Sequence, residues 1–392
     1  GQSHMKITGI ETFPVKSGGW GAWLFCAVRT DEGITGYSQF GEGKFAHGLP
    51  GIIEDLSGWL IGKDPDPVEK FYMDMYRQTR SMSGGATAMA IAGIELALWD
   101  IKGKRYGVPV HQLVGGPHRD RQRVYWSHLA TYRAENAELY GGAPLLTLED
   151  VADCAAEAVE KGYTAFKTNI VFHGENASAI NQGFFQSDDQ NATTELVHHA
   201  ERQIGAMRSA VGPDIGIALD INYNFKTEGA IRIARELEPH NLMWLEIDNQ
   251  DAQALAQLKA STTTPICTGE QLLGVRQYQP YFKRHAMDTV KVDVQWQGFS
   301  QSKKVADLAE TYDLNIAPHN YGSHLSSFQS LNLTAAVSNV RIMESDVDAA
   351  PWRDELTTVL PDIKDGYMAI PQTPGWGSDL NEDALKKYRF DG

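Results

Sequence analysis

Residues 215–220 read IGIALD, a short apolar run that ends on an aspartate. Five more short apolar runs follow along the chain, and each leads to a polar residue that could take part in chemistry: Glu246, Glu270, Asp293, His319 and Glu344. Counted from Asp220, these residues lie 26, 24, 23, 26 and 25 positions apart. One strand and one helix occupy about that length, and eight such units close a (β/α)8-type barrel. The spacing therefore predicts an α/β protein built on a parallel barrel.

Lys167 belongs to the same series, because it lies in an earlier predicted strand at residues 164–171. It precedes Asp220 by 53 residues, and we assign the excess length to an insertion at residues 172–193, which is rich in Asn, Gln, Ser and Asp. The C-terminal ends of barrel strands converge on one mouth. Residues that are remote in the sequence are therefore expected to become neighbours there.

The segments before and after the predicted barrel lack its repeated strand–helix pattern. Residues 6–15 alternate as a strand, residues 24–30 and 34–38 flank a hairpin turn, and residues 86–104 carry an apolar stripe at helical spacing. After Pro351 the βα rhythm stops. We expect three parts: an N-terminal α+β domain at residues 5–120, a modified TIM barrel at 121–350, and a C-terminal tail at 351–392 that packs on the N-terminal domain.

The composition is that of a globular protein, with 42% hydrophobic and 22% charged residues among 392. The net charge of −15 opposes nucleic acid and membrane as partners, since both favour a cationic face. The acidic excess is either solvated surface or in part a set of cation ligands. Residues 1–5 read GQSHM, which we interpret as a tag remnant that ends at the native Met5, with no signal peptide. Cys26, Cys154 and Cys267 suit buried thiols in a cytoplasmic protein.

Three of the predicted strand-end residues, Asp220, Glu246 and Glu270, form an all-oxygen set on consecutive strands. Mg²⁺ prefers octahedral oxygen ligands and keeps positions for water and substrate. Any one of these carboxylates could instead form a salt bridge at the barrel mouth. Three of them converging without a cation would repel one another strongly. The trio is therefore the predicted magnesium site.

The next two strand ends carry Asp293 and His319. A carboxylate bonded to one imidazole nitrogen fixes the tautomer and raises the basicity of the other nitrogen. His319 is thus the candidate base, and His324 is a rival five residues later. Lys167 is either an acid/base group or a charge partner for a metal carboxylate. Glu344 is either a protonated donor to the substrate or part of a salt bridge.

The chain resembles the enolase superfamily, in particular the acid-sugar dehydratases of the mandelate racemase subgroup. The resemblance spans nearly all of the chain from Met5 and is most specific in AGIELALWD at 92–100, KG at 102–103 and GVPVHQLVGG at 107–116, together with the strand-end series. It implies that the N-terminal domain caps the barrel and is completed by the tail. It also implies loops over the mouth near residues 20–23 and 40–47, which makes residues such as Trp20 and His47 specificity candidates, unless these are ordinary hairpin loops.

The resemblance further implies a homo-oligomer and a reaction on a small-molecule carboxylate. Mg²⁺ on the three carboxylates would bind the substrate carboxylate, a base would remove the α-proton, and an enediolate would lose its β-hydroxyl to give a 2-keto-3-deoxy acid. An aldonate or aldarate dehydratase is therefore the expected activity. The alternatives are an epimerase, racemase or cycloisomerase that uses the same enediolate, and a barrel that binds acid sugars without turnover.

Two departures from the family pattern bear on this expectation. Family members often carry Lys-x-Lys on the second strand, whereas residues 167–169 read KTN, so the second lysine is replaced by Asn169. Racemisation needs an acid/base group on each face of the substrate, so this change disfavours a racemase. Galactonate-dehydratase-like members that lack this lysine have a histidine where this chain has Asn222. In addition, Glu246 is followed by Ile247 and Asp248 rather than by proline, so Asp248 is either a fourth ligand or the true one.

Four further side chains just past predicted strand ends are substrate-binding candidates. Trp296 and Tyr321 would stack on a sugar-acid chain or merely wall the mouth. Asn169 and Asn222 would bond substrate hydroxyls or simply cap loops.

Overall fold

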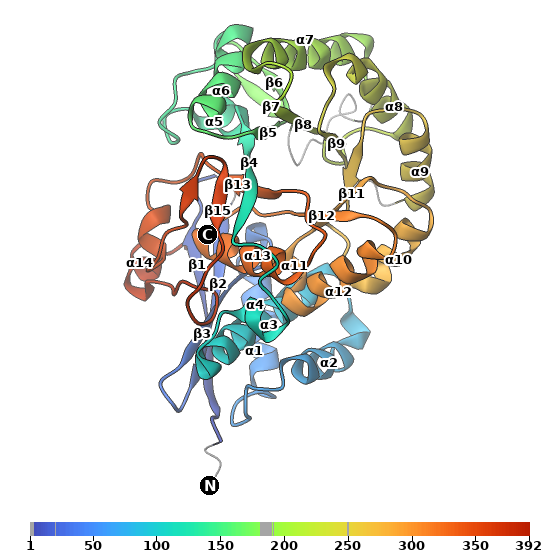
Figure 1. Cartoon of the computed structure of the whole chain (residues 1–392). Helices are drawn as coiled ribbons and strands as arrows, with labels where there is room; N and C mark the ends of the chain where they lie inside the picture. Colours follow the sequence, from blue (N-terminus) through green and yellow to red (C-terminus); the bar gives the residue numbers. More distant parts are fainter. Residues whose placement is uncertain (1–3, 20, 181–189, 191, 249–250) are drawn as a thin grey trace.

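A computed structural model describes residues 4–19, 21–180, 190, 192–248 and 251–392 of the chain. Its N-terminal part is an antiparallel sheet in the order β1-β2-β3, followed by helices (Figure 1). Its elements are β1 (Ile7–Lys16), β2 (Ala22–Thr30), β3 (Thr35–Phe40), η1 (Gly43–Phe45), α1 (Gly48–Ser57), α2 (Val68–Gln78), η2 (Arg80–Met82), α3 (Gly85–Tyr106) and α4 (Val110–Leu113). The predicted strand, hairpin and helix of this region are all present.

Helix α3 lies directly against β3. Ser38 Oγ donates to Gly93 O at 2.6 Å. A Cβ atom at residue 93 would lie 2.6 Å from the Phe40 ring, so only glycine permits this approach. The helix ends where expected, because Gly107 adopts the left-handed conformation (φ 70°) of a C-terminal cap.

The second part is a closed barrel of eight parallel strands. Seven follow the order β12-β11-β10-β9-β8-β5-β4, the eighth, β13, pairs with β4, and a bridge between Ile316 and Val340 completes the ring. The strands are β4 (Arg121–Leu129), β5 (Ala165–Thr168), β8 (Gly216–Asp220), β9 (Trp244–Glu246), β10 (Ile266–Thr268), β11 (Thr289–Val292), β12 (Asn315–Pro318) and β13 (Met343–Asp346). The predicted barrel is confirmed.

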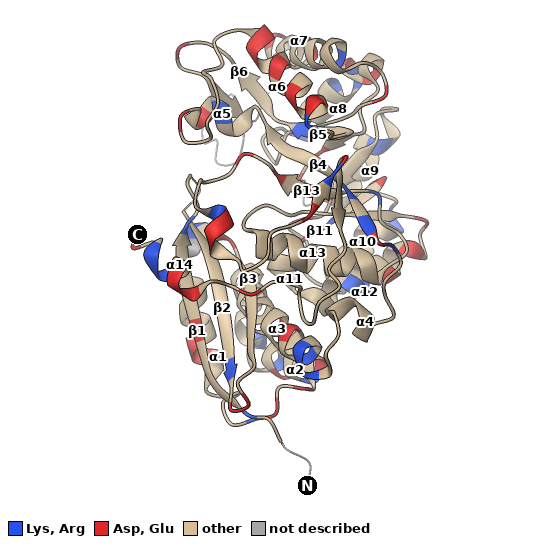
Figure 2. Cartoon of the chain, turned by 60° about the vertical axis from the view of Figure 1, so that its left-hand side comes forward, with Lys and Arg blue, Asp and Glu red and all other residues tan. Residues whose placement is uncertain are grey.

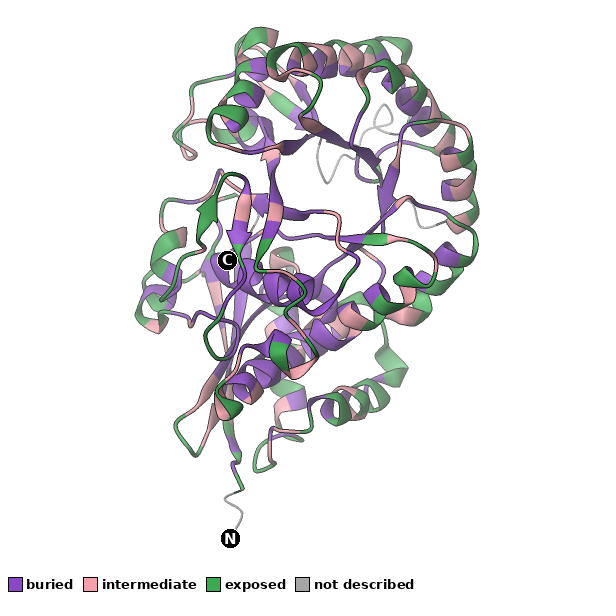
Figure 3. Ribbon diagram, viewed as in Figure 1, coloured by how far each residue is buried: buried purple, intermediate pink, exposed green. Residues whose placement is uncertain are grey.

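Helices run around the outside of this ring (Figure 1). They are α5 (Thr131–Asn136), α6 (Leu148–Glu160), α7 (Thr194–Val211), α8 (Thr227–Glu236), η4 (Glu238–His240), α9 (Ala252–Ala260), α10 (Val275–Lys283), α11 (Val294–Gln297), α12 (Phe299–Glu310) and α13 (His324–Ala336). In Figure 3 the barrel strands and α13 are buried, while the outer faces of the surrounding helices are exposed.

Two strand predictions needed correction. The strand expected at residues 164–171 is split into β5 and β6 (Ile170–Phe172), because Asn169 leaves the sheet and its side chain donates to Asp220 O at 3.0 Å. β6 pairs with β7 (Ser178–Ile180) in the predicted insertion, and most of the residues after β7 up to α7 lie outside the described part. The last barrel strand does not end at Glu344 but continues to Asp346.

The tail contacts both other parts of the chain. It comprises η5 (Arg353–Leu356), β14 (Ile363–Lys364), β15 (Tyr367–Ala369) and α14 (Glu382–Lys387). β15 pairs antiparallel with β4 of the barrel, while Phe390 N donates to Pro14 O of β1 at 3.0 Å. Between them, the buried Trp376 donates from its backbone N to Asp100 of α3 at 2.9 Å. No helix follows β13 on the barrel surface, because the tail takes that place.

Cys26, Cys154 and Cys267 are buried and unpaired, as expected. Within the described ranges, no helix has both the length and the apolar character that crossing a membrane requires.

Candidate active site

Three buried carboxylates meet at one end of the barrel. Asp220 and Glu246 are the last residues of β8 and β9, and Glu270 follows β10 by two residues. One ligand atom from each of the three side chains lies within 4.8 Å of the others. The convergence follows from the topology, since β8, β9 and β10 are neighbours in a parallel sheet.

The charges in this group are poorly balanced. Burial and the charge of Glu246 raise the pKa of Asp220 to about 8, and burial raises the pKa of Glu270 as well. Burial would also raise the pKa of Glu246, but Lys167 and Lys291 outweigh it and hold that pKa at about 2. A divalent cation among these carboxylates would relieve their mutual repulsion.

Asp248 borders the three carboxylates without belonging to their compact group. Burial, followed by the charges of Glu270 and Asp220, raises its pKa well above the ordinary value. Its Oδ1 atom is buried and has no hydrogen-bond partner among the described residues. A compact set of three carboxylates with a spare buried oxygen beside it fits a hard divalent cation. The compact group contains Glu246 and does not include Asp248.

Lys167 is enclosed by carboxylates. From β5 its Nζ lies 2.8 Å from Glu344, 3.0 Å from Glu246 and 3.4 Å from Asp220. Burial opposes its charge, but Glu246 and Glu344 outweigh burial and raise the pKa of Lys167 well above the ordinary value. The side chain is therefore an ammonium ion, which corresponds to the charge-partner alternative.

Glu344 completes this ion pair. Ser127 Oγ donates to one carboxylate oxygen at 2.6 Å, and Asn320 N donates to the other at 2.8 Å. Burial would raise its pKa, but Lys167 and Lys291 outweigh burial and hold it well below the ordinary value. The salt-bridge alternative describes this carboxylate better than the protonated donor does.

His319 faces the carboxylates from β12. Its Nδ1 lies 2.5 Å from Asp293 Oδ2, and its Nε2 lies 2.9 Å from Glu270. Burial lowers the pKa of His319, but Glu270 and Glu344 outweigh burial and raise it well above the ordinary value. Asp293 thus orients the ring so that Nε2 points into the mouth, the arrangement expected of an acid/base dyad.

His324 does not compete for this position. Its Nε2 lies 2.6 Å from Asp354 of the tail, and it is absent from the residues that line the mouth pocket. Burial lowers its pKa to about 4. The two histidines lie five positions apart, yet of the two it is His319 that faces the three clustered carboxylates.

Some of the predicted substrate-binding residues line the mouth pocket and others do not. Asn222 and Tyr321 line the mouth pocket. Trp296 packs edge-on against His319 with the ring centroids 5.0 Å apart, and Asn169 bonds Asp220 O and Asn222, so both support the pocket from behind. His47 is exposed at the start of α1, away from the residues that line the pocket. Trp20 lies outside the described residues.

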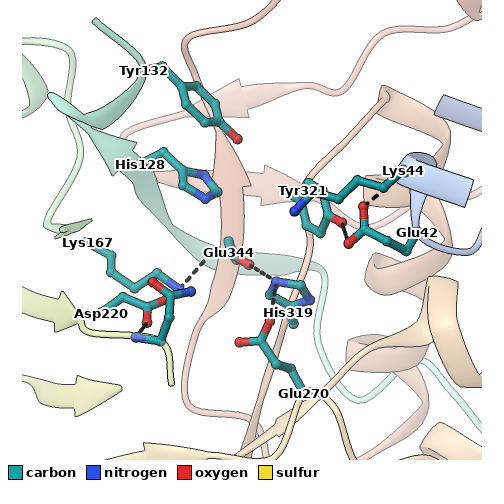
Figure 4. Close-up of a pocket in the computed structure, with 11 residues that line it drawn as sticks. Glu42, Lys44, His128, Tyr132, Lys167, Asp220, Glu270, His319, Tyr321 and Glu344 are labelled. Atoms are coloured by element: carbon teal, nitrogen blue, oxygen red, sulfur yellow. Dashed lines mark hydrogen bonds and ion pairs between the residues drawn. The ribbon is translucent and has the colours of Figure 1, made fainter. Parts of the chain in front are cut away.

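The pocket also contains residues that the strand-end argument missed. It is a partly open hollow lined mainly by polar and charged side chains. Figure 4 shows His128 and Tyr132 on one side of Glu344, with Tyr321, Glu42 and Lys44 on the other. His128 lies near the end of the first barrel strand, β4, so extending the register to that strand would have found it. Glu42 and Lys44 come from the N-terminal domain, from the loop at residues 40–47 that the family resemblance implies over the mouth.

A second pocket adjoins the first and shares Glu42, Tyr132 and Tyr321 with it. Trp23 and Tyr140 add further aromatic walls. The charged residues described along it are the carboxylates Glu42, Asp346 and Asp348. The hollow therefore has one end at Lys167 and the three carboxylates that could hold a metal ion, and an aromatic, acidic end that includes residues of the N-terminal domain.

Comparison with known families matches both parts of the chain. Residues 17–115 match the mandelate racemase / muconate lactonizing enzyme N-terminal domain, and residues 150–384 match the enolase C-terminal domain-like family. The second match alone covers more than half of the chain.

Individual relatives cover almost the whole length. The D-xylonate dehydratase of Haloferax volcanii is 31% identical across 100% of this chain and 91% of its own. The D-galactonate dehydratase of Xanthomonas oryzae pv. oryzae is 29% identical across 98% of this chain and 94% of its own. A crystal structure from Burkholderia xenovorans strain LB400, provisionally named an L-alanine-DL-glutamate epimerase and bound to magnesium and fumarate, is 39% identical with a TM-score of 0.94, over 98% of this chain and 96% of that one.

Proposed function

Because this chain belongs to the enolase superfamily, in its mandelate racemase subgroup, we propose that it is a Mg²⁺-dependent acid-sugar dehydratase. The observation that carries the proposal is the His319–Asp293 dyad facing the Asp220, Glu246 and Glu270 carboxylates, with Asn169 in place of a second lysine. The named dehydratase relatives, about 30% identical over nearly the full chain, support the same reaction class.

The metal-binding end of the pocket would hold the substrate carboxylate. Mg²⁺ held by Asp220, Glu246 and Glu270 supplies a Lewis acid that makes the α-proton of a bound carboxylate more acidic. Lys167 lies within 3.4 Å of Asp220, Glu246 and Glu344, and its ammonium group would become a second positive charge beside the substrate carboxylate once a cation balances Asp220 and Glu246. This placement leaves the α-carbon within reach of the mouth-facing nitrogen of His319.

His319 would remove the α-proton. In its neutral form Nδ1–H donates to Asp293, and Nε2, which lies 2.9 Å from Glu270 in this structure, would accept the α-proton once Glu270 is engaged by the cation. The electron pair of the broken C–H bond then forms a double bond between the α- and β-carbons as the β-hydroxyl leaves. The resulting enol tautomerises to a 2-keto-3-deoxy acid.

The same arrangement argues against an epimerase. Epimerisation needs a second acid/base group on the opposite face of the α-carbon, and position 169 on the second strand holds an amide that donates to Asp220 O and Asn222. Lys167 remains tied to carboxylates by three short contacts. The amide of Asn169 has no proton to exchange at neutral pH, so this position cannot supply the second acid/base group that the second lysine supplies in other family members.

The distal end of the pocket favours an aldonate over an aldarate. Of the carboxylates along this end, Asp346 is paired with His128 and Asp348 with Arg133, so these cations are already engaged. Glu42 would repel a second substrate carboxylate, whereas a neutral polyol can bond Glu42 and stack on Tyr132 and Tyr321. Monocarboxylic sugar acids are therefore the expected substrates.

A panel of aldonates and aldarates, with Mg²⁺ and semicarbazide detection of keto acids, tests the reaction. We expect keto acid from at least one aldonate and little or none from the matching aldarate. Exchange of the α-proton with solvent deuterium, without keto acid, would instead identify an epimerase. Turnover of aldarates only would contradict the distal-pocket argument.

Two substitutions test the assigned roles. His319→Asn should lower kcat by about 10²–10⁴-fold because it removes the base. His324→Asn is the matched control, since it removes a buried, carboxylate-bonded histidine outside the pocket, and it should keep wild-type kcat. Equal losses in the two variants would contradict the role of His319.

Glu246→Gln tests the metal site. Mg²⁺ should raise the melting temperature of the wild type, since a ligand that binds the folded state stabilises it, and this rise should be lost in Glu246→Gln together with turnover. A variant that stays folded and keeps its activity would contradict the metal assignment.

A further inference from the structure

A second histidine–carboxylate pair lies across the pocket from His319. His128 Nδ1 lies 2.7 Å from Asp346 Oδ1, and Tyr132 donates to the other oxygen of Asp346 at 3.0 Å. The His128 ring stacks on Tyr132, with centroids 4.4 Å apart and an interplanar angle of 13°. Because Nδ1 is occupied by Asp346, Nε2 is the ring nitrogen available to a ligand in the pocket that His128 lines.

The backbone at His128 departs from regular strand geometry, and this sets the direction of the side chain. The pairing of β4 with β5 shifts register between Trp126 and Leu129, and bulges of this kind redirect side chains near active sites. His128 itself has φ 52°, a left-handed conformation that non-glycine residues seldom adopt. Such strain at a pocket-lining residue indicates that the position of the side chain matters.

The histidine lies where the two ends of the hollow meet. His128 lines the pocket with Lys167 and Asp220, whereas its partner Asp346 lines the distal pocket. Tyr321 borders both histidines, with its ring centroid 5.1 Å from that of His319 and 6.4 Å from that of His128 (Figure 4). A substrate whose carboxylate lies at Lys167 and whose polyol lies in the distal pocket would pass its β-carbon between the two rings.

We propose that His128, oriented by Asp346, is the general acid that protonates the departing β-hydroxyl. This inference rests on the proposed dehydration. The proton on His128 Nε2 passes to the hydroxyl oxygen as the bond between the β-carbon and that oxygen breaks, and the group leaves as water. The electrons for the new double bond come from the C–H bond that His319 opens, so the step needs no further reactant.

The surroundings of His128 favour its protonated form. Asp346 of β13 is bonded to it, Glu344 of the same strand and Lys167 of β5 act on it electrostatically, and Glu135 of α5 lies near enough for His128 to lower its pKa. The phenols of Tyr132 and Tyr321 are the other titratable groups on its faces. Burial lowers the pKa of His128, but Asp346 outweighs burial and raises it above the ordinary value. The imidazolium form is the one that can donate.

The test compares two leaving groups in His128→Asn. With the best aldonate from the panel, we expect kcat for keto-acid formation to fall about 10²-fold or more. The α-proton should still exchange with solvent deuterium, because His319 is intact. With the 3-deoxy-3-fluoro analogue, fluoride leaves without a proton, so the variant should release fluoride within a few-fold of the wild-type rate.

Asp346→Asn is a second test variant, and it keeps the imidazole ring of His128. It removes the carboxylate charge that favours the imidazolium, so the alkaline limb of kcat should move to lower pH with the aldonate and stay in place with the fluoro analogue. His240→Asn is the matched control, because His240 also bonds a carboxylate, Glu201 at 2.8 Å, with 18% of its side chain exposed compared with 17% for His128. It should match the wild type with both substrates.

Dehydration of the aldonate by His128→Asn at nearly the wild-type rate would overturn the inference. Equal loss with both leaving groups would also overturn it, because it would show that His128 only shapes the pocket. If the wild type forms no keto acid from any acid sugar, the proposed function itself fails, and the inference fails with it. Comparing wild type and variant on one substrate therefore separates the two failures.

Discussion

At the scale of single residues, carboxylates decide what each buried histidine can do. His319 meets Asp293 and Glu270 inside the mouth, whereas His324 is paired with Asp354, whose side chain is 68% exposed. The exposed partner stabilises a charge weakly because water screens it. Burial therefore dominates at His324 and lowers its pKa, while the enclosed carboxylates dominate at His319 and raise its pKa.

The low pKa of His324 predicts a pH dependence of stability. Its folded-state pKa of about 4 lies below the unfolded value of about 6.5, so the unfolded chain binds more protons between these values. Stability is then fully present above pH 6.5 and falls as the pH drops towards 4, by up to about 3 kcal/mol from this group.

Urea unfolding at pH 7 and pH 5 checks this, with the difference in unfolding free energy compared between wild type and His324→Gln. The variant should lose less stability on acidification than the wild type. An identical loss in both proteins would show that His324 is protonated in the folded state.

At the scale of elements, the motif at residues 92–100 joins the N-terminal domain to the barrel. Glu95 of α3 accepts from the backbone N–H groups of Phe299 and Ser300 at 2.9 and 2.8 Å, the first two residues of α12. A carboxylate at this position satisfies free N–H groups and complements the helix dipole. One turn later on α3, Asp100 accepts from Trp376 N of the tail.

Glu95→Gln is expected to destabilise the protein by about 1–3 kcal/mol, because one donor loses its acceptor in a buried place. Glu69→Gln is the matched control: Glu69 also joins the N-terminal domain to α12, through Lys304 at 2.9 Å, but its side chain is 58% exposed, so its removal should change stability by less than about 1 kcal/mol. Urea unfolding of both variants measures the difference. Equal effects would contradict the capping role of Glu95.

At the scale of the whole molecule, the net charge of −15 opposes the approach of an anionic substrate. Acidic and basic side chains are spread over the outer helices (Figure 2), while the positive groups of the mouth, Lys167 and Lys44, are few. Fields from exposed charges are screened over about 10 Å at 0.1 M salt and over about 30 Å at 0.01 M. The global repulsion therefore acts mainly at low ionic strength.

We expect kcat/KM for an aldonate to rise roughly twofold as NaCl increases from about 10 to 150 mM, because screening removes this repulsion. Steady-state kinetics at constant Mg²⁺ measures it, and kcat at saturating substrate should stay constant. A fall in kcat/KM with salt would show that the local cations steer the substrate more strongly than the net charge repels it.

The spacing of strand ends was sufficient to predict the barrel and the convergence of Asp220, Glu246, Glu270, Asp293 and His319, because parallel strands of one barrel all end at the same mouth. Local patterns also predicted the hairpin, α3 and its glycine cap, since these depend on neighbours in the sequence.

Other features of the site depend on contacts between segments far apart in the chain, and only the tertiary structure decides them. Sequence left Lys167 and Glu344 each with two possible roles, and their 2.8 Å ion pair forms across β5 and β13, far apart in the chain. It also left His324 as a rival of His319, although His324 pairs with Asp354 of the tail and His319 with Glu270 of the mouth. Glu42 and His128 enter the pocket through domain packing and a bulged strand. The protonation state of each side chain, and the groups that it can contact, depend on the surrounding charges and on burial. Both exist only once the chain has folded.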